Sequence, residues 1–344
     1  MKPGRIFAHK QKIILIMKEL FHICLTAHSE VLLRNIDDVR LLTNNSALSA
    51  YRCATDMLTD SFMSTHLHEM VMTDSPAAFA KRQAQSITKA FNHKYGRTGP
   101  LFDPPPFILR IQGPKHTQMA FNYSLRQGMH HGQSETPFSY PWSTCNYLFT
   151  GERGVNEECP AYSSRSELRE FFSKNSDFPD EWQADRNGIL LRKSFEQLKI
   201  VENWYGSARS YLFSMIRRTS EEWLAEQQKD DTKEPAITLD LLETGYSSEE
   251  VSHMLENEGN SKYVHRGMSD MEVCEIIDNE CLGRFGADTV YALSQDQKDR
   301  IAKELNCDLG IHPIRLTFPA ASMNSCAQNR SRTQPMPCRR TLTN

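Results

Sequence analysis

The pattern of hydrophobic and polar positions changes period several times along the first 130 residues, which predicts strands alternating with helices. Residues 20–28 (LFHICLTAH) alternate and carry β-branched and aromatic side chains, as strands do. Ser75-Pro76 is a typical helix start, and Gly96 is a typical helix end. Together, the periodicity and these signals predict strands over residues 20–28, 57–64, 66–73 and 107–112, and helices over 36–54, 75–95 and 113–129.

The order strand-helix-strand-strand-helix-strand-helix predicts an α+β fold, in which helices lie on an antiparallel or mixed sheet. A polar run around residues 157–166 follows Gly151 and Gly154 and indicates a boundary near residue 150. We therefore expect a domain over residues 1–150, an acidic and mostly α-helical region over 151–310, and a disordered tail over 311–344. Helix starts in the acidic region are indicated by Thr219 with Glu222, Ser247 with Glu250, Ser269 with Glu272, and Ser294 with Gln297.

The composition excludes several classes of protein. No apolar run approaches the ~18 residues of a membrane helix, and residues 13–17 are too few for a signal peptide core of about 7–15 residues. The nine cysteines include no Cys-x-x-Cys pair, which argues against a zinc ribbon and favours reduced thiols. We therefore expect a cytoplasmic protein that does not enter a membrane.

The net charge of −3 conceals an uneven distribution. Residues 1–150 carry 16 Lys and Arg against 10 Asp and Glu, whereas residues 151–310 carry 19 against 33. The tail, residues 311–344, carries five basic residues and no acidic ones. An anion such as nucleic acid would therefore bind the N-terminal part rather than the middle of the chain.

His66 and His68 stand two residues apart on a predicted strand, so that both imidazoles point to the same face. Such a pair can converge on one metal ion, although two histidines alone do not choose between zinc, manganese and a harder cation. Histidines spaced in this way also occur on surfaces and in cores without any metal. His130 and His131, at the end of the helix over residues 113–129, are further candidate ligands or cap the helix.

Tyr123 and Gln127 are spaced i, i+4 and lie on one face of the same predicted helix. A phenol facing a metal can be a covalent nucleophile on phosphorus if the cation polarises the phosphate. The amide oxygen of Gln127 could complete the coordination. The alternative is that Tyr123 packs its ring in the core.

Four segments together resemble a known family. They are residues 62–68 (FMSTHLH), 91–102 (FNHKYGRTGPLF), 122–127 (NYSLRQ) and 138–143 (FSYPWS). In this order they are similar to the IS200-like single-tyrosine transposases of the HUH group, especially the REP-associated branch. The resemblance covers about residues 20–149 and implies a ferredoxin-like α+β domain that cuts single-stranded DNA, often at the foot of a hairpin.

The resemblance also implies a role for each matching residue. Tyr123 would attack the scissile phosphate and form a 5′-phosphotyrosine link, while His66, His68 and Gln127 would hold Mg²⁺ or Mn²⁺. The protein would act as a monomer or homodimer on single-stranded or hairpin DNA. Candidate DNA-binding residues are Lys89, Asn92, Lys94, Arg97 and Arg126.

The sequence departs from the family at three places. Residues 103–106 (DPPP) stand where basic or aromatic side chains are usual, and Gln127 stands where the REP-associated branch often has Asn, a change that retains the amide oxygen. Gly128-Met129 follow Gln127 where the family has a proline. Two other hypotheses therefore stay open. One is an inactive relative that binds hairpin DNA as a regulator, and the other is an unrelated metallohydrolase that uses His66, His68 and either His130 or His131.

Overall fold

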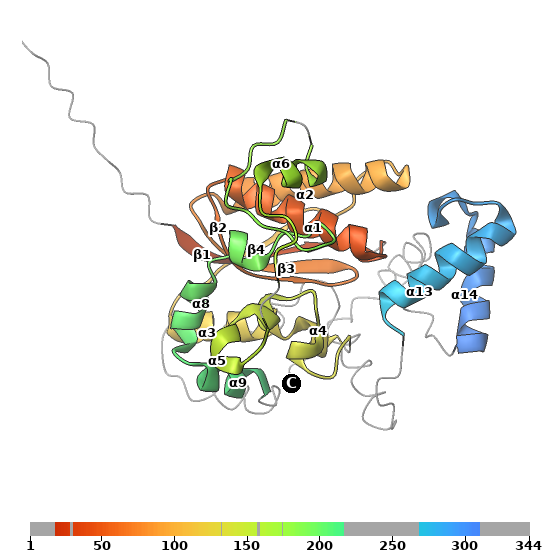
Figure 1. Ribbon diagram of the computed structural model, residues 1–344. Helices are drawn as coiled ribbons and strands as arrows, with labels where there is room; N and C mark the ends of the chain where they lie inside the picture. Colours follow the sequence, from red (N-terminus) through yellow and green to blue (C-terminus); the bar gives the residue numbers. More distant parts are fainter. Residues whose placement is uncertain are drawn as a thin grey trace, which may run out of the picture.

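A four-stranded antiparallel sheet forms the centre of the molecule (Figure 1). The computed structural model describes residues 18–27, 30–131, 133–156, 159–173, 175–216 and 268–309. The strands are β1 (Glu19–Thr26), β2 (Asp56–Phe62), β3 (His66–Thr73) and β4 (Phe107–Arg110). They lie in the order β2-β3-β1-β4, and every neighbouring pair is antiparallel. With a helix after β1 and another after β3, this order is the ferredoxin-like arrangement, so the predicted α+β fold class is confirmed.

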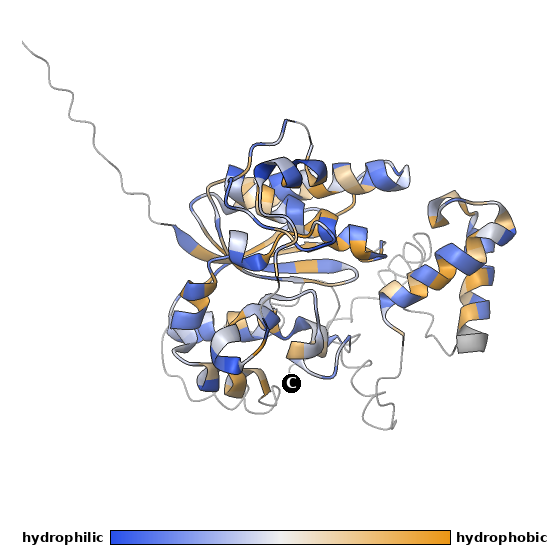
Figure 2. Ribbon diagram, in the orientation of Figure 1, coloured by the Kyte–Doolittle hydropathy of each residue, from blue (hydrophilic) through white to orange (hydrophobic). Residues whose placement is uncertain are grey.

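One face of the sheet is covered by α1 (Ile36–Arg52) and α2 (Pro76–Tyr95) (Figure 1). Asn35 and Asp38 form a capping box that begins α1, and Gly96 ends α2 in the left-handed conformation. Both helices carry hydrophobic residues on part of their surface and hydrophilic residues on the rest (Figure 2). The apolar side of α2 packs Phe79 and Ala80 on the strands, which fixes this helix above β1 and β3.

Short helices cover the opposite face of the sheet (Figure 1). They are α3 (Pro114–Leu125), α4 (Gln127–His130), α5 (Thr150–Arg153), α8 (Leu198–Tyr205) and α9 (Ala208–Ile216). The predicted helix over residues 113–129 is thus interrupted at Arg126, which has the non-helical angles φ −99° and ψ 6°. A core of buried side chains, among them Met70, Phe121 and Tyr211, joins this layer to the sheet.

Residues 159–216 pack against the sheet domain. Their helices include α6 (Arg165–Leu168) and α7 (Arg192–Phe195), with a 3-10 turn at Arg169–Phe171. Two further 3-10 turns, at Pro137–Ser139 and Thr144–Tyr147, precede this region. Leu168, Phe178 and Trp182 share a buried cluster with Ala47 and Leu48 of α1. Glu196 forms a parallel bridge to Met57, at the β2 edge of the sheet.

A helical pair, α13 (Asp270–Ile276) and α14 (Gln295–Leu309), has a small core of its own. Between them lie a π-helical turn, Ile277–Cys281, and 3-10 turns at Leu282–Phe285 and Val290–Ala292. The predicted helix start at Ser269 and Glu272 is confirmed as a capping box. Arg34 joins this pair to the sheet domain through an ion pair with Asp278, 2.7 Å long.

The predicted helix starts at Thr219 and Ser247, and the predicted disordered tail over 311–344, lie outside the described residues. Among the helices that are described, none is long and apolar enough to span a membrane.

Candidate active site

His66 and His68 project from β3 toward the layer that contains α3 and α4. The alternation of the strand places both on one face, as the sequence predicted, and their exposed fractions are only 2% and 1%. Their ring centroids are 4.8 Å apart. His131, the C-terminal cap of α4, brings a third imidazole to within 4.8 Å of His66, measured between ring centroids. The ligand atoms of these three histidines all lie within 4.8 Å of one another, a spacing compatible with a divalent metal site.

Tyr123 approaches the same histidines from α3. Its ring centroid lies 5.4 Å from that of His68, with the two ring planes nearly perpendicular. The ring centroid of His130 lies 6.0 Å from that of Tyr123. The structure therefore brings together the phenol and the two imidazoles that the sequence singled out, on a helix and a strand that face each other.

Gln127 is the first residue of α4, four positions after Tyr123. Its side-chain Nε2 donates to the backbone carbonyl of Tyr123 at 3.1 Å. Its Oε1 is buried and has no hydrogen-bond partner among the described residues, and the same is true of Nε2 of His68. A buried polar atom without a partner is costly, and both atoms are of the type that ligates a divalent ion. These residues therefore fit a metal ion.

Burial favours the neutral form of two histidines of the site, His68 and His131. It lowers the pKa of His68 well below 6.5, and the neighbouring His66 lowers it further. Burial likewise lowers the pKa of His131. Because only the neutral imidazole ligates metals, this electrostatic state suits ligation.

Sequence reasoning missed one member of the group, His22, and left another open, His131. His22 lies on β1, the neighbour of β3, and its Nε2 is 3.0 Å from Nδ1 of His68. The alternation of residues 20–28 predicts the face on which His22 lies, but only the pairing of β1 with β3 shows which residue it meets. His130 is the last residue of α4 and His131 is its C-cap, and of the two only His131 belongs to the group with His66 and His68.

Three of the five candidate DNA-binding residues are engaged in ion pairs or hydrogen bonds within the protein, and a fourth is buried. Lys94 forms an ion pair with Asp38 at 2.6 Å, and Arg97 forms one with Glu30 at 2.7 Å. Asn92 donates to the carbonyl of Gly99 at 2.7 Å. Arg126 is buried, with an exposed fraction of 5%. Lys89 is exposed on α2, and a role in DNA binding stays a prediction for all five.

The glycine at position 128, one of the departures from the family pattern, has a local reason. A Cβ at this position would lie 2.2 Å from Cγ of Tyr140. The phenol of Tyr140 donates to the carbonyl of Phe62, at the end of β2. Gly128 therefore lets α4 approach the segment that is tied to the sheet beside the histidines.

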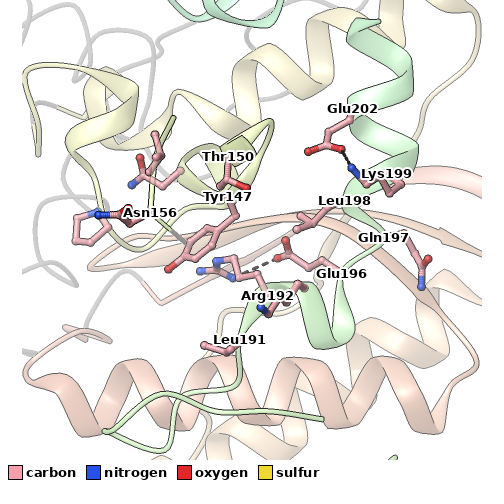
Figure 3. Close-up of a pocket in the computed structure, with 14 residues that line it drawn as sticks. Tyr147, Thr150, Asn156, Leu191, Arg192, Glu196, Gln197, Leu198, Lys199 and Glu202 are labelled. Carbon is pink, nitrogen blue, oxygen red and sulfur yellow. Dashed lines mark hydrogen bonds and ion pairs between the residues drawn. The ribbon is translucent and has the colours of Figure 1, made fainter. Parts of the chain in front are cut away.

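A cavity of about 560 Å³ lies elsewhere, beside α7 and α8 (Figure 3). Its lining includes Tyr147, Arg192 and Glu196 but none of the histidines and not Tyr123. In Figure 3 the guanidinium of Arg192 lies below the ring of Tyr147 and is joined to Glu196. The cavity is therefore separate from the histidine site.

No protein-family model matches the chain, and no curated protein matches it either. Among solved structures, the chain is similar to a REP-associated tyrosine transposase bound to a REP hairpin. That likeness has a TM-score of 0.34 and 15% identity, and it covers 45% of this chain and 88% of the other. The chain is also similar to a candidate transposase from Deinococcus radiodurans R1, with a TM-score of 0.24, 19% identity, and coverage of 35% and 92%.

Proposed function

We propose that the protein is a transposase-type enzyme that cuts and rejoins single-stranded DNA through a 5′-phosphotyrosine link. The observation that carries this proposal is the approach of Tyr123 on α3 to the imidazoles of β3, at 5.4 Å between the ring centroids of Tyr123 and His68. A phenol packed only for stability has no need of metal-ligating groups opposite its ring. The motifs that resemble the single-tyrosine transposases assign the same residues.

The chemistry needs a phosphate held beside Tyr123. The phenol oxygen attacks phosphorus and loses its proton, while the bond from phosphorus to the 3′ oxygen breaks and that oxygen takes up a proton. A second 3′-hydroxyl then displaces the phenol in the reverse exchange, so the number of phosphodiester bonds is unchanged.

We assign His66, His68 and Gln127 as the residues that hold a divalent ion, Mg²⁺ or Mn²⁺, with His131 as a further nitrogen donor. When bound, the ion polarises the phosphate and neutralises the charge that develops on it. Gln127 has a second task within the chain, because its Nε2 bonds to the backbone of Tyr123 and so couples a ligand to the nucleophile.

The test is a trapping experiment with the full chain. Labelled hairpin-bearing single strands are incubated with Mn²⁺, and a denaturation-resistant protein–DNA adduct is sought on a gel. Tyr123→Phe should bind the strands but form no adduct, whereas the control Tyr51→Phe, at a partly exposed tyrosine of α1, should form it as the wild type does. An adduct that persists in Tyr123→Phe would exclude Tyr123 as the nucleophile.

One observation favours a second candidate, a metallohydrolase. His66, His68 and His131 present three nitrogen donors, which is a set that zinc also accepts in catalytic sites. That candidate requires tightly bound zinc and a small substrate. If it holds, Tyr123→Phe should leave the hydrolytic activity nearly unchanged. Loss of the adduct in Tyr123→Phe therefore separates the two.

A further inference from the structure

His22 and His68 are joined through the edges of their rings. The planes are almost parallel, at 8°, and the centroids are 5.1 Å apart. The nitrogens Nε2 of His22 and Nδ1 of His68 are much closer, at 3.0 Å. The centroids are farther apart than the two nitrogens by about two ring radii, which is the spacing of rings that meet edge to edge. The rings are therefore joined by a nitrogen-to-nitrogen hydrogen bond and do not stack face to face.

This hydrogen bond has two possible directions, because each neutral imidazole carries one proton. If His22 donates, the proton of His68 lies on its Nε2, which then has no lone pair to offer. If His68 donates from Nδ1, its Nε2 has a free lone pair. That Nε2 is the buried atom without a partner among the described residues, and it is on the side of the ring away from His22.

We propose that His22 is a positioning residue for the metal site, which accepts the Nδ1 proton of His68 and so turns the Nε2 lone pair of His68 toward the ion. This inference rests on the metal site of the proposed function. Ligating histidines usually donate their other ring proton to a carboxylate or a carbonyl, which fixes tautomer and orientation. Here an imidazole takes that place, and it adds no negative charge to the site.

The arrangement has a cost that a bound ion offsets. When His22 accepts at Nε2, its own proton is on Nδ1, and that atom is also buried without a partner in the described part of the chain. Without metal, either direction of the bond therefore leaves one N–H of the pair unsatisfied. Metal ligation favours one of them, so we expect the tautomer of His68 to become uniform when the ion binds.

The test measures metal affinity rather than DNA cleavage. Mn²⁺, Co²⁺ and Zn²⁺ are titrated calorimetrically into the full chain and into His22→Phe and His22→Gln. Loss of the acceptor in His22→Phe should weaken binding about 10–100-fold, and the amide oxygen of His22→Gln should restore part of the affinity. The matched control is His93→Gln, at an exposed histidine of α2, which should bind as the wild type does.

A second measurement covers the case in which His22→Phe does not fold. Nitrogen NMR of the wild type with diamagnetic Zn²⁺ should show His68 protonated at Nδ1 only. Wild-type metal affinity in both His22 variants, or a proton on Nε2 of His68 in the metal-loaded protein, would refute the role of His22 but not the metal site. If the wild type binds none of the three ions, the metal site itself is refuted, and with it the metal-dependent part of the proposed function.

Discussion

Two buried polar clusters lie on opposite faces of the same sheet, and they differ in how their buried polar groups are compensated. The imidazole cluster consists of His22, His66, His68 and His131. The carboxylate cluster consists of Asp60, Glu69, Arg192 and Glu196. The two meet within one strand, because His68 and Glu69 are consecutive residues of β3 and so point to opposite faces.

The carboxylate cluster carries its own counter-charge. Arg192 forms ion pairs with Asp60 and with Glu196, the latter at 3.2 Å. Thr144 adds a hydrogen bond to Glu196 at 3.0 Å. Buried charges that are paired in this way belong to the structure of the protein.

The imidazole cluster contains no such cation. His22 and His68 turn a nitrogen toward each other, and the second nitrogen of His68, Nε2, is buried with no partner among the described residues. Three imidazoles that converge in this manner are compatible with a divalent metal site, as we propose. The two clusters therefore differ in that one contains an internal counter-charge and the other, the proposed metal site, does not.

The largest effect expected from this comparison is on the carboxylate cluster. Arg192→Met removes the cation and leaves Asp60 and Glu196 buried without it, which should lower the free energy of unfolding by about 3–5 kcal/mol. Urea denaturation measures the change. The control is Arg165→Met, which breaks ion pairs to the exposed Asp177 and Asp180 and should change stability very little. Equal losses in the two variants would contradict the structural role.

The next effect is on the imidazole cluster, which should gain stability from metal. At a free ion concentration of about 100 times the Kd, Mn²⁺ or Zn²⁺ should raise the free energy of unfolding by about 2.7 kcal/mol. His131→Ala removes one of the three nitrogen donors and should reduce this gain, whereas His93→Ala should not. Thermal unfolding with and without the ion measures the difference. A gain of the same size in His131→Ala would exclude His131 as a ligand.

The same contrast explains how much the sequence could predict. The strands, the helices and the face of His66 and His68 follow from local periodicity, and Tyr123 and Gln127 follow from helical spacing. Contacts between residues far apart in sequence do not follow in this way. His22 meets His68 because β1 pairs with β3, and Arg192 reaches Asp60 from a helix 132 positions further along the chain. Neither partner leaves a local signal.

The two clusters also differ in how their stability responds to pH, because a fall in pH destabilises one and a rise in pH destabilises the other. Burial lowers the pKa of His22 to about 3. Since its unfolded pKa is near 6.5, the unfolded chain binds the proton more readily, and stability is lost as the pH falls from about 6.5 toward 3. Burial, reinforced by Asp60, raises the pKa of Glu69 to about 8. For Glu69 the folded protein holds the proton more tightly, so stability is lost as the pH rises from about 4.5 to 8.

Within its pH window, each group should change the free energy of unfolding by about 1.4 kcal/mol per pH unit. Glu69→Gln keeps the neutral form of the side chain and the hydrogen-bonding contact with Gln83. Its stability should therefore match that of the wild type near pH 5 and exceed it increasingly toward pH 8. Urea denaturation between pH 5 and 8 measures the two curves, with the exposed Glu170→Gln expected to follow the wild type throughout. Parallel curves for wild type and Glu69→Gln would mean that Glu69 is ionised in the folded protein as it is in the unfolded one.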